Sequence, residues 1–258
     1  MEQLNPHSIL VTGANRGLGL ELVRQLVEKN NPPKWIFATC RDPVGPRAQD
    51  LKSLAAEHPQ IVIIALDTND PCSVKDAAAK VTEHLKEAGL NLLVNNAGIL
   101  KLSTIETETP ENMSEVYKTN VIGPMIVSQA FLPLLRKASQ KSPQKGMSCS
   151  KAAILNVTSE CGSMTTLFGW KLNELISYRC SKSALNMLTR CQSMHFAEDE
   201  ILCITLHPGW VQTDMGNELG TPPLTMEESL RAILKTLGRL SEKDHGTFIN
   251  WEGNLIPW

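Results

Sequence analysis

The chain has 258 residues, and its 25 basic and 27 acidic side chains leave a formal net charge of −2 at pH 7. This balance argues against a surface that binds nucleic acid or an anionic membrane through bulk charge. No run of about 18 apolar residues is present, as a membrane-spanning helix would require. The seven cysteines are scattered singly, and neither they nor the six histidines fall at metal-ligand spacing. We therefore expect no metal site, free thiols and a cytoplasmic protein.

Short apolar segments alternate with longer segments of helical periodicity. Helices are expected between the strands, including one long helix over 110–137 and the helix that carries Tyr178. The expected strands are 8–13, 35–40, 61–66, 90–96, 152–159, 201–209 and 247–250. Near-continuous apolar strands between helices predict a parallel sheet covered on both faces. We expect an α/β fold with one domain over 1–258, a Rossmann-type doubly wound sheet of about seven strands whose ligands bind at the strands' carboxyl ends. Within it, the polar segment 137–151 is expected to be a surface loop.

The turn after the first expected strand is rich in glycine and reads TGANRGLG over residues 12–19. Glycines allow a tight turn and let a pyrophosphate approach a helix N-terminus, where free N–H groups and the helix dipole favour anions. Such a turn alone is also compatible with an ordinary strand–helix connection. Its position between the first strand and the first helix favours a dinucleotide site.

Tyr178 and Lys182 lie four residues apart on an expected helix, so their side chains share one face. An ammonium beside a phenol favours the phenolate, and the pair is therefore either a general acid/base or a solvated surface pair. Ser159 follows the fifth expected strand, where it is suited to stabilise a developing oxyanion or to cap a turn. Together with the glycine turn, these positions favour the catalytic interpretation.

The ordered set of motifs resembles the short-chain dehydrogenase/reductase family across essentially the whole chain. Its landmarks are TGxxxGxG at 12–19, NNAG at 95–98, Asn120, Ser159, YxxxK at 178–182 and PG at 208–209. The segments HPGWVQTDMG and FINWEGNLIPW are most similar to the sniffer-type carbonyl reductases.

The resemblance implies a catalytic role for Tyr178, Lys182, Ser159 and Asn120. Tyr178 would protonate a carbonyl oxygen, while Lys182 would lower the pKa of the phenol and hold the nicotinamide ribose. Asn120 would help to hold a water that relays protons to the lysine; otherwise it is a tolerated polar residue in a helix.

The resemblance also implies a set of cofactor-binding residues. Within it, Asp67 would contact the adenine amino group or cap the next turn, and Thr213 would bind the nicotinamide carboxamide. The full set is Gly13, Asn15, Arg16, Gly17, Leu18, Gly19, Arg41, Asp67, Asn95, Ala97, Gly98, Tyr178, Lys182, Pro208, Gly209, Val211 and Thr213.

The residues after the second strand bear on the choice between NAD and NADP. Cys40 stands where an NAD enzyme places a carboxylate, and Arg41 follows it. With Arg16 as a second guanidinium, the pair favours a 2′-phosphate, although Asp42 could pair with Arg41 and weaken the clamp. We expect NADP, used as NADPH in the reductive direction.

The segment between Ser159 and Tyr178 carries large apolar side chains. They predict an apolar substrate pocket, or else they pack in the core. The residues are Met164, Leu167, Phe168 and Trp170, with Trp210 and Met215 from the other side. The Gly/Pro-rich segment 214–225 is expected to be a mobile substrate lid.

These expectations combine into a specific functional prediction. The protein would be an NADPH-dependent carbonyl reductase acting on an apolar aldehyde, ketone or quinone. The alternatives are a non-catalytic NADPH-binding redox sensor or scaffold, and a hydroxysteroid or alcohol dehydrogenase working in the oxidative direction. The resemblance further implies a homodimer paired through the helices that follow strands four and five.

Overall fold

The structure is a computed structural model that describes residues 4–258, so the first three residues of the expected domain lie outside it. Seven strands form a parallel sheet in the order β3-β2-β1-β4-β5-β6-β7. They are β1 (Ser8–Thr12), β2 (Trp35–Cys40), β3 (Ile61–Ala65), β4 (Leu92–Asn95), β5 (Ala153–Val157), β6 (Leu202–His207) and β7 (Phe248–Asn250). The predicted single-domain, doubly wound sheet is confirmed.

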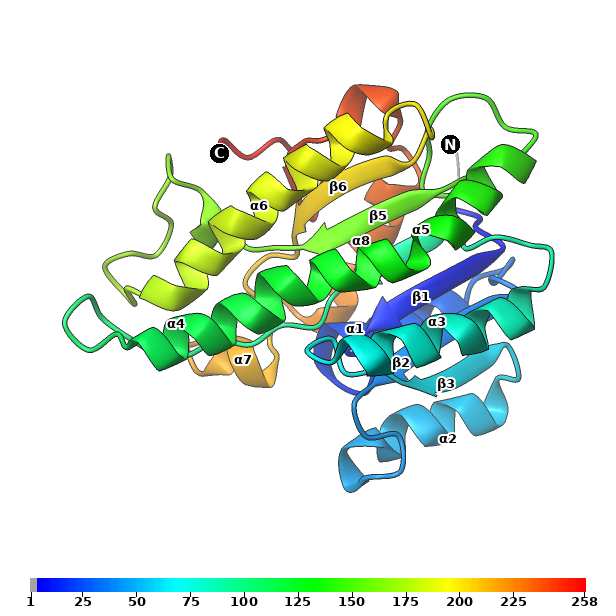
Figure 1. The fold of residues 1–258 in the computed structure, drawn as a ribbon. Coiled ribbons are helices and arrows are strands. Elements are labelled where there is room, and N and C mark those ends of the chain that lie inside the picture. The colour runs from blue at the N-terminus through cyan, green and yellow to red at the C-terminus, as the bar shows by residue number, and fades with distance from the viewer. Residues whose placement is uncertain (1–3) are drawn as a thin grey trace.

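Helices cover both faces of this sheet, and strands such as β1 and β6 are accordingly buried along their whole length. In β1, Ile9 and Val11 face one apolar core while Leu10 faces the other, because successive strand residues point to opposite sides. One core is closed by α1 (Gly17–Val27), α2 (Gln49–Glu57) and α8 (Met226–Leu237). The other is closed by α3 (Pro71–Leu85), α5 (Gly123–Lys141) and α6 (Ile176–Phe196), which lie across the front of the sheet in Figure 1. Within residues 4–258, no helix has the length and apolar character needed to cross a membrane.

The expected long helix over 110–137 is interrupted in the structure. Helix α4 (Pro110–Tyr117) passes into a π-helical turn at Lys118–Ile122, and α5 then continues to Lys141. The prediction was therefore wrong on both the continuity and the end of this helix, whose last turn occupies the start of the expected 137–151 loop. The turn is stabilised by tertiary bonds, since the Asn120 side chain binds the backbone of Ile99, and such turns often accompany functional sites.

Candidate active site

A cavity of about 120 Å³ lies at the carboxyl ends of β5 and β6, the edge where doubly wound sheets bind ligands. It is bounded by the residues that follow β5, by the start of α6 and by the segment after β6, which includes α7 (Asp214–Asn217). Of the residues predicted from sequence, the cavity brings together Leu18, Ser159, Tyr178, Pro208, Gly209, Val211 and Thr213.

Tyr178 and Lys182 both lie on the buried side of α6. Their side chains form one unit, with the Lys182 Nζ 5.5 Å from the centroid of the Tyr178 ring. The ammonium donates a hydrogen bond to the Val157 carbonyl at the end of β5, at 2.9 Å. Burial lowers the pKa of Lys182 to about 8, because a charged amine is poorly solvated there. Both side chains are therefore buried and do not form a solvated surface pair; Tyr178 lines the cavity, whereas Lys182 lies outside its lining.

The acidity of the Tyr178 phenol is set mainly by its surroundings in the cavity wall. Burial raises the pKa of Tyr178 above its ordinary value, the nearby Cys161 thiol adds to the rise, and a hydrogen bond with the Ser159 side chain opposes it. The pKa of Tyr178 is therefore raised, and the hydrogen bond with Ser159, rather than the expected effect of Lys182, is what opposes the rise. A phenol of this kind keeps its proton at neutral pH and holds it within hydrogen-bond reach of Ser159.

Asn120 is fully buried behind this pair and ties three segments together. Its Oδ1 accepts from the Ile99 amide at 2.9 Å, and its Nδ2 donates to the Ile99 carbonyl at 2.9 Å and to Ser181 Oγ at 3.0 Å. A Cβ at Gly98 would lie 3.3 Å from Asn120 Oδ1 and 3.7 Å from Lys182 Nζ. Asn120, Lys182 and the segment after β4 thus converge at one point, where Gly98 leaves the space for them.

The glycine-rich turn depends on backbone conformations and contacts that side chains would prevent. Gly13 and Gly17 have φ values of +64° and +53°, which favour glycine. A Cβ at Gly19 would overlap the Gly13 carbonyl oxygen, so the strand and helix approach each other closely there. The side-chain Nδ2 of Asn96 donates to the carbonyls of Thr12 and Gly13 at 2.9 and 3.2 Å, and these bonds hold the turn against the end of β4.

Several predicted cofactor residues have contacts within the protein that fix their positions. The side-chain Nδ2 of Asn15 donates to the Arg47 carbonyl at 3.2 Å. The backbone N–H of Ala97 donates to Thr12 Oγ1 at 3.0 Å. Asn95 is the last residue of β4, and its Nδ2 donates to Oδ1 of Asn156 in β5 at 2.8 Å. It therefore braces the sheet.

Asp67 and Thr213 each act as local caps in the structure. The Asp67 carboxylate accepts from the Asn69 amide at 2.9 Å, which is the turn-capping role that the sequence left open. Thr213 Oγ1 accepts from the Gly216 amide at 3.1 Å and so begins α7. The Thr213 side chain also lines the cavity, whereas Asp67 lies outside its lining.

The two predicted phosphate-clamp arginines have different environments. Arg41 is exposed after β2, and Asp42 accepts instead from the amides of Val44 and Gly45 at 3.2 and 2.9 Å. Among residues 4–258, the ion pairs include none between Asp42 and Arg41. Arg16 forms an ion pair with Asp214 at 3.1 Å, a contact that links residues far apart in the sequence and that sequence reasoning missed.

The predicted apolar pocket is formed in part by other residues. Phe168, Trp210 and Met215 line the cavity as expected. Met164, Leu167 and Trp170 were wrongly placed in it: their exposed fractions are 72, 51 and 43%, and they lie outside the lining. Leu172 and Leu175, from the segment before α6, and Leu219, after α7, line the cavity in their place. Within the first of these segments, Leu167 and Leu175 have positive φ.

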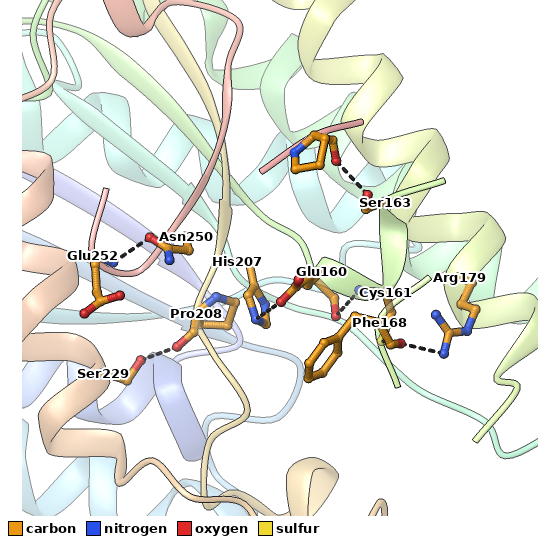
Figure 2. Close-up of polar contacts among 12 residues, drawn as sticks. Glu160, Cys161, Ser163, Phe168, Arg179, His207, Pro208, Ser229, Asn250 and Glu252 are labelled. Carbon is orange, nitrogen blue, oxygen red and sulfur yellow. Dashed lines mark hydrogen bonds and ion pairs between the residues drawn. The ribbon is translucent and has the colours of Figure 1, made fainter. Parts of the chain in front are cut away.

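Phe168 and the segment after β6 are held in place by hydrogen bonds. Arg179 Nη2 donates to the Phe168 carbonyl at 2.9 Å, and Ser229 Oγ of α8 donates to the Pro208 carbonyl at 2.7 Å (Figure 2). The expected lid is anchored at its base, where Val211 and Leu224 form an isolated β-bridge. Within residues 4–258, no cluster of three or more His, Cys, Asp or Glu side chains is arranged to hold a metal ion.

Comparison with known proteins agrees with this geometry. Residues 7–223 match the short chain dehydrogenase family, and the chain belongs to that family of oxidoreductases. It is 30% identical to an uncharacterized oxidoreductase of Schizosaccharomyces pombe, with 96% of each chain covered.

Two solved structures are similar over nearly the whole chain. The NADPH-bound carbonyl reductase from chicken fatty liver has a TM-score of 0.94 and 56% identity, covering 99% of this chain and 100% of that one. The carbonyl reductase Sniffer of Drosophila melanogaster has a TM-score of 0.93 and 37% identity, covering 98% and 100%. The predicted similarity to the sniffer-type branch of the family is confirmed.

Proposed function

We propose that this protein is an NADPH-dependent carbonyl reductase acting on aldehydes, ketones or quinones. The observation that carries the proposal is that Tyr178 and Ser159 line a largely apolar cavity, with the buried Lys182 next to the Tyr178 ring. The similar protein from chicken fatty liver is an NADPH-bound carbonyl reductase, which supports both the cofactor and the reaction.

NADPH would supply the hydride that adds to the carbonyl carbon, and the protein would manage the charge and the proton at the carbonyl oxygen. Ser159 donates a hydrogen bond to that oxygen as negative charge develops on it. Tyr178 then transfers its phenolic proton to the oxygen, which completes the alcohol. A positive charge on Lys182, 5.5 Å from the Tyr178 ring, stabilises the phenolate that remains until it is reprotonated.

The residues present suit a dinucleotide. The turn of Gly13, Gly17 and Gly19 opens at the start of α1, where backbone N–H groups are available to a pyrophosphate. Lys182 Nζ donates to the Val157 carbonyl, and its remaining N–H groups suit the nicotinamide ribose hydroxyls. Arg41 and Arg16 would bind the 2′-phosphate, and the remaining cofactor contacts are those that the family resemblance implies. The whole chain, 1–258, would serve as a single domain for this purpose.

The direct test is the loss of NADPH absorbance with a small panel of aldehydes, ketones and quinones. We expect turnover of apolar panel members, together with slower oxidation of the corresponding alcohols by NADP. Tight NADPH binding without turnover of any panel member would contradict the proposal and favour a redox sensor or scaffold.

The pH dependence of the reaction should follow Lys182. Its pKa of about 8 means that the ammonium is present at lower pH and is lost as the pH rises through that value. Without the charge, the phenolate formed from Tyr178 is less stable, so kcat/KM should fall about tenfold per pH unit above about 8. The measurement is kcat/KM for an apolar ketone against pH at constant ionic strength. A profile that stays flat to about pH 10 would contradict this role of Lys182.

Cofactor preference should depend on Arg41. The substitution Arg41→Ala removes an exposed guanidinium placed to bind the 2′-phosphate, so we expect kcat/KM for NADPH to fall about tenfold and that for NADH to stay unchanged. Arg231→Ala, which removes an exposed guanidinium on α8, is the matched control and should change neither value. An equal decrease of kcat/KM with NADPH and with NADH would show that Arg41 does not recognise the 2′-phosphate.

We also propose a homodimer in the cytoplasm. Exposed apolar side chains follow one another along α4, the π-helical turn and the start of α5: Met113, Tyr117, Ile122 and Met125 are 36–45% exposed. A second copy would cover them, and the free thiols fit a reducing compartment. Light scattering should give twice the mass of one chain, and a monomeric mass would overturn the dimer.

A further inference from the structure

A second cavity, of about 380 Å³, lies next to the first. It is bounded by the segment after β5, the segment after β6 and the residues after β7 that end the chain. The two cavities share Phe168, His207, Gly209 and Trp210 as lining residues, so one wall separates them. A molecule that reaches past this wall would contact both cavities at once.

The second cavity combines aromatic walls with one carboxylate. Phe168, Trp210 and Trp251 supply the rings, and Glu160 supplies the charge. In the part of the chain that the structure describes, no lysine or arginine lines this cavity. A negatively charged group beside aromatic faces is the environment that attracts an organic cation, since the ring faces also carry partial negative charge.

The charge of Glu160 is not offset by the protein. Its side chain is 27% exposed, and its ion-pair partner among residues 4–258 is the His207 imidazole, with Nε2 3.8 Å from Oε2 (Figure 2). Burial lowers the pKa of His207 to about 4, so the imidazole is neutral at physiological pH. Burial also raises the pKa of the Glu160 carboxyl, which shows that the carboxylate is poorly solvated where it stands. Glu160 is therefore a partly desolvated anion without a cationic partner.

We propose that the second cavity binds an organic ammonium group carried by the carbonyl substrate, with Glu160 as the residue that determines this specificity. The carbonyl end lies at Tyr178 and Ser159 in the first cavity, and the cationic end lies between Glu160 and the rings of Trp210 and Trp251. This inference rests on the proposed reductase function and adds a substrate class to it: apolar carbonyl compounds with a positively charged amine at the far end.

The test is a matched pair of substrates. An aryl ketone carrying a trimethylammonium group on an alkyl linker is compared with the same ketone carrying an uncharged tert-butyl group of nearly equal shape. We expect wild-type kcat/KM to favour the cationic ketone by about tenfold over a series of linker lengths. Glu160→Gln should reduce this preference to near unity and leave kcat/KM for the neutral ketone unchanged. Glu83→Gln, which neutralises an exposed carboxylate on α3, is the matched control and should keep the preference.

A binding measurement separates this inference from the proposed reaction. Benzyltrimethylammonium, titrated by calorimetry into the wild type, should bind, and binding should weaken about tenfold in Glu160→Gln, with equal melting temperatures for the two proteins. Reduction of the neutral ketone, with no cationic preference and no effect of Glu160→Gln on ammonium binding, would overturn the inference and leave the reductase function intact. Binding that depends on Glu160 without turnover of any ketone would support the cation site and contradict the reductase function.

Discussion

Replacement of Tyr178 by phenylalanine should lower kcat for carbonyl reduction about 10²–10⁴-fold, the range for loss of a positioned general acid. The substitution removes the phenolic hydroxyl that is proposed to pass a proton to the substrate oxygen, and it keeps the ring, which lines the cavity. Burial keeps the phenol of the wild type in its protonated form, and the phenylalanine has no proton to donate. The measurement is kcat with saturating NADPH and an apolar ketone, with NADPH binding measured separately.

The chain offers a close control for this substitution. It contains two tyrosines, and Tyr117 at the end of α4 is 45% exposed and outside the cavity. Tyr117→Phe should therefore keep full activity. NADPH should bind to Tyr178→Phe within a few-fold of wild type, and both variants should melt at the wild-type temperature. Residual activity above a tenth of wild type in Tyr178→Phe would exclude Tyr178 as the proton donor.

Replacement of Gly19 by alanine should destabilise the fold by roughly 3 kcal/mol, the upper part of the range for an overpacked site. In an open helix the same change would stabilise by up to about 1 kcal/mol, because alanine is the better helix former. Here the added methyl would overlap the Gly13 carbonyl oxygen and lie 2.7 Å from Asn96 Nδ2. The strand–helix turn must then open, and we expect NADPH affinity to fall with it.

Urea unfolding and NADPH titration of the same variant measure both consequences. Gly169→Ala is the control, because nothing lies within 4 Å of the methyl it would add, and its cost is limited to about 1 kcal/mol from a φ of +67°. Wild-type stability together with wild-type NADPH affinity in Gly19→Ala would show that the close approach of the strand and the helix is dispensable.

Much of the fold could be predicted because its signals are local. Apolar segments such as 8–12 and 35–40 are buried strands. Short, nearly continuous apolar segments that alternate with helices indicate a parallel sheet without any tertiary information. The helix after β4 was predicted less well. Nothing in its local sequence indicates the π-helical turn at Lys118–Ile122, because the bonds that accompany it run from Asn120 to Ile99, a residue 21 positions away.

The residues that line the pocket could likewise be predicted only in part from the local sequence. Met164, Leu167 and Trp170 are as apolar as the residues that line the cavity, and composition alone could not separate them. Their orientation depends on how the segment before α6 turns, and that turn is held by Arg179, whose side chain binds the carbonyls of Phe168 and Asn173. Likewise, the pairing of Arg16 with Asp214 joins residues that no local pattern relates.

The sequence by itself determined the sheet, the family and the identity of the chemical groups, because periodicity, glycine spacing and the Tyr178–Lys182 interval are properties of neighbouring residues. The tertiary structure decided the environment of those groups. It buries Tyr178 and Lys182 together, which sets their proton affinities, and it places Glu160 beside a second cavity with a neutral His207 as its partner. Solvation and charge pairing depend on everything packed around a group, and for that reason they could be seen only in the folded chain.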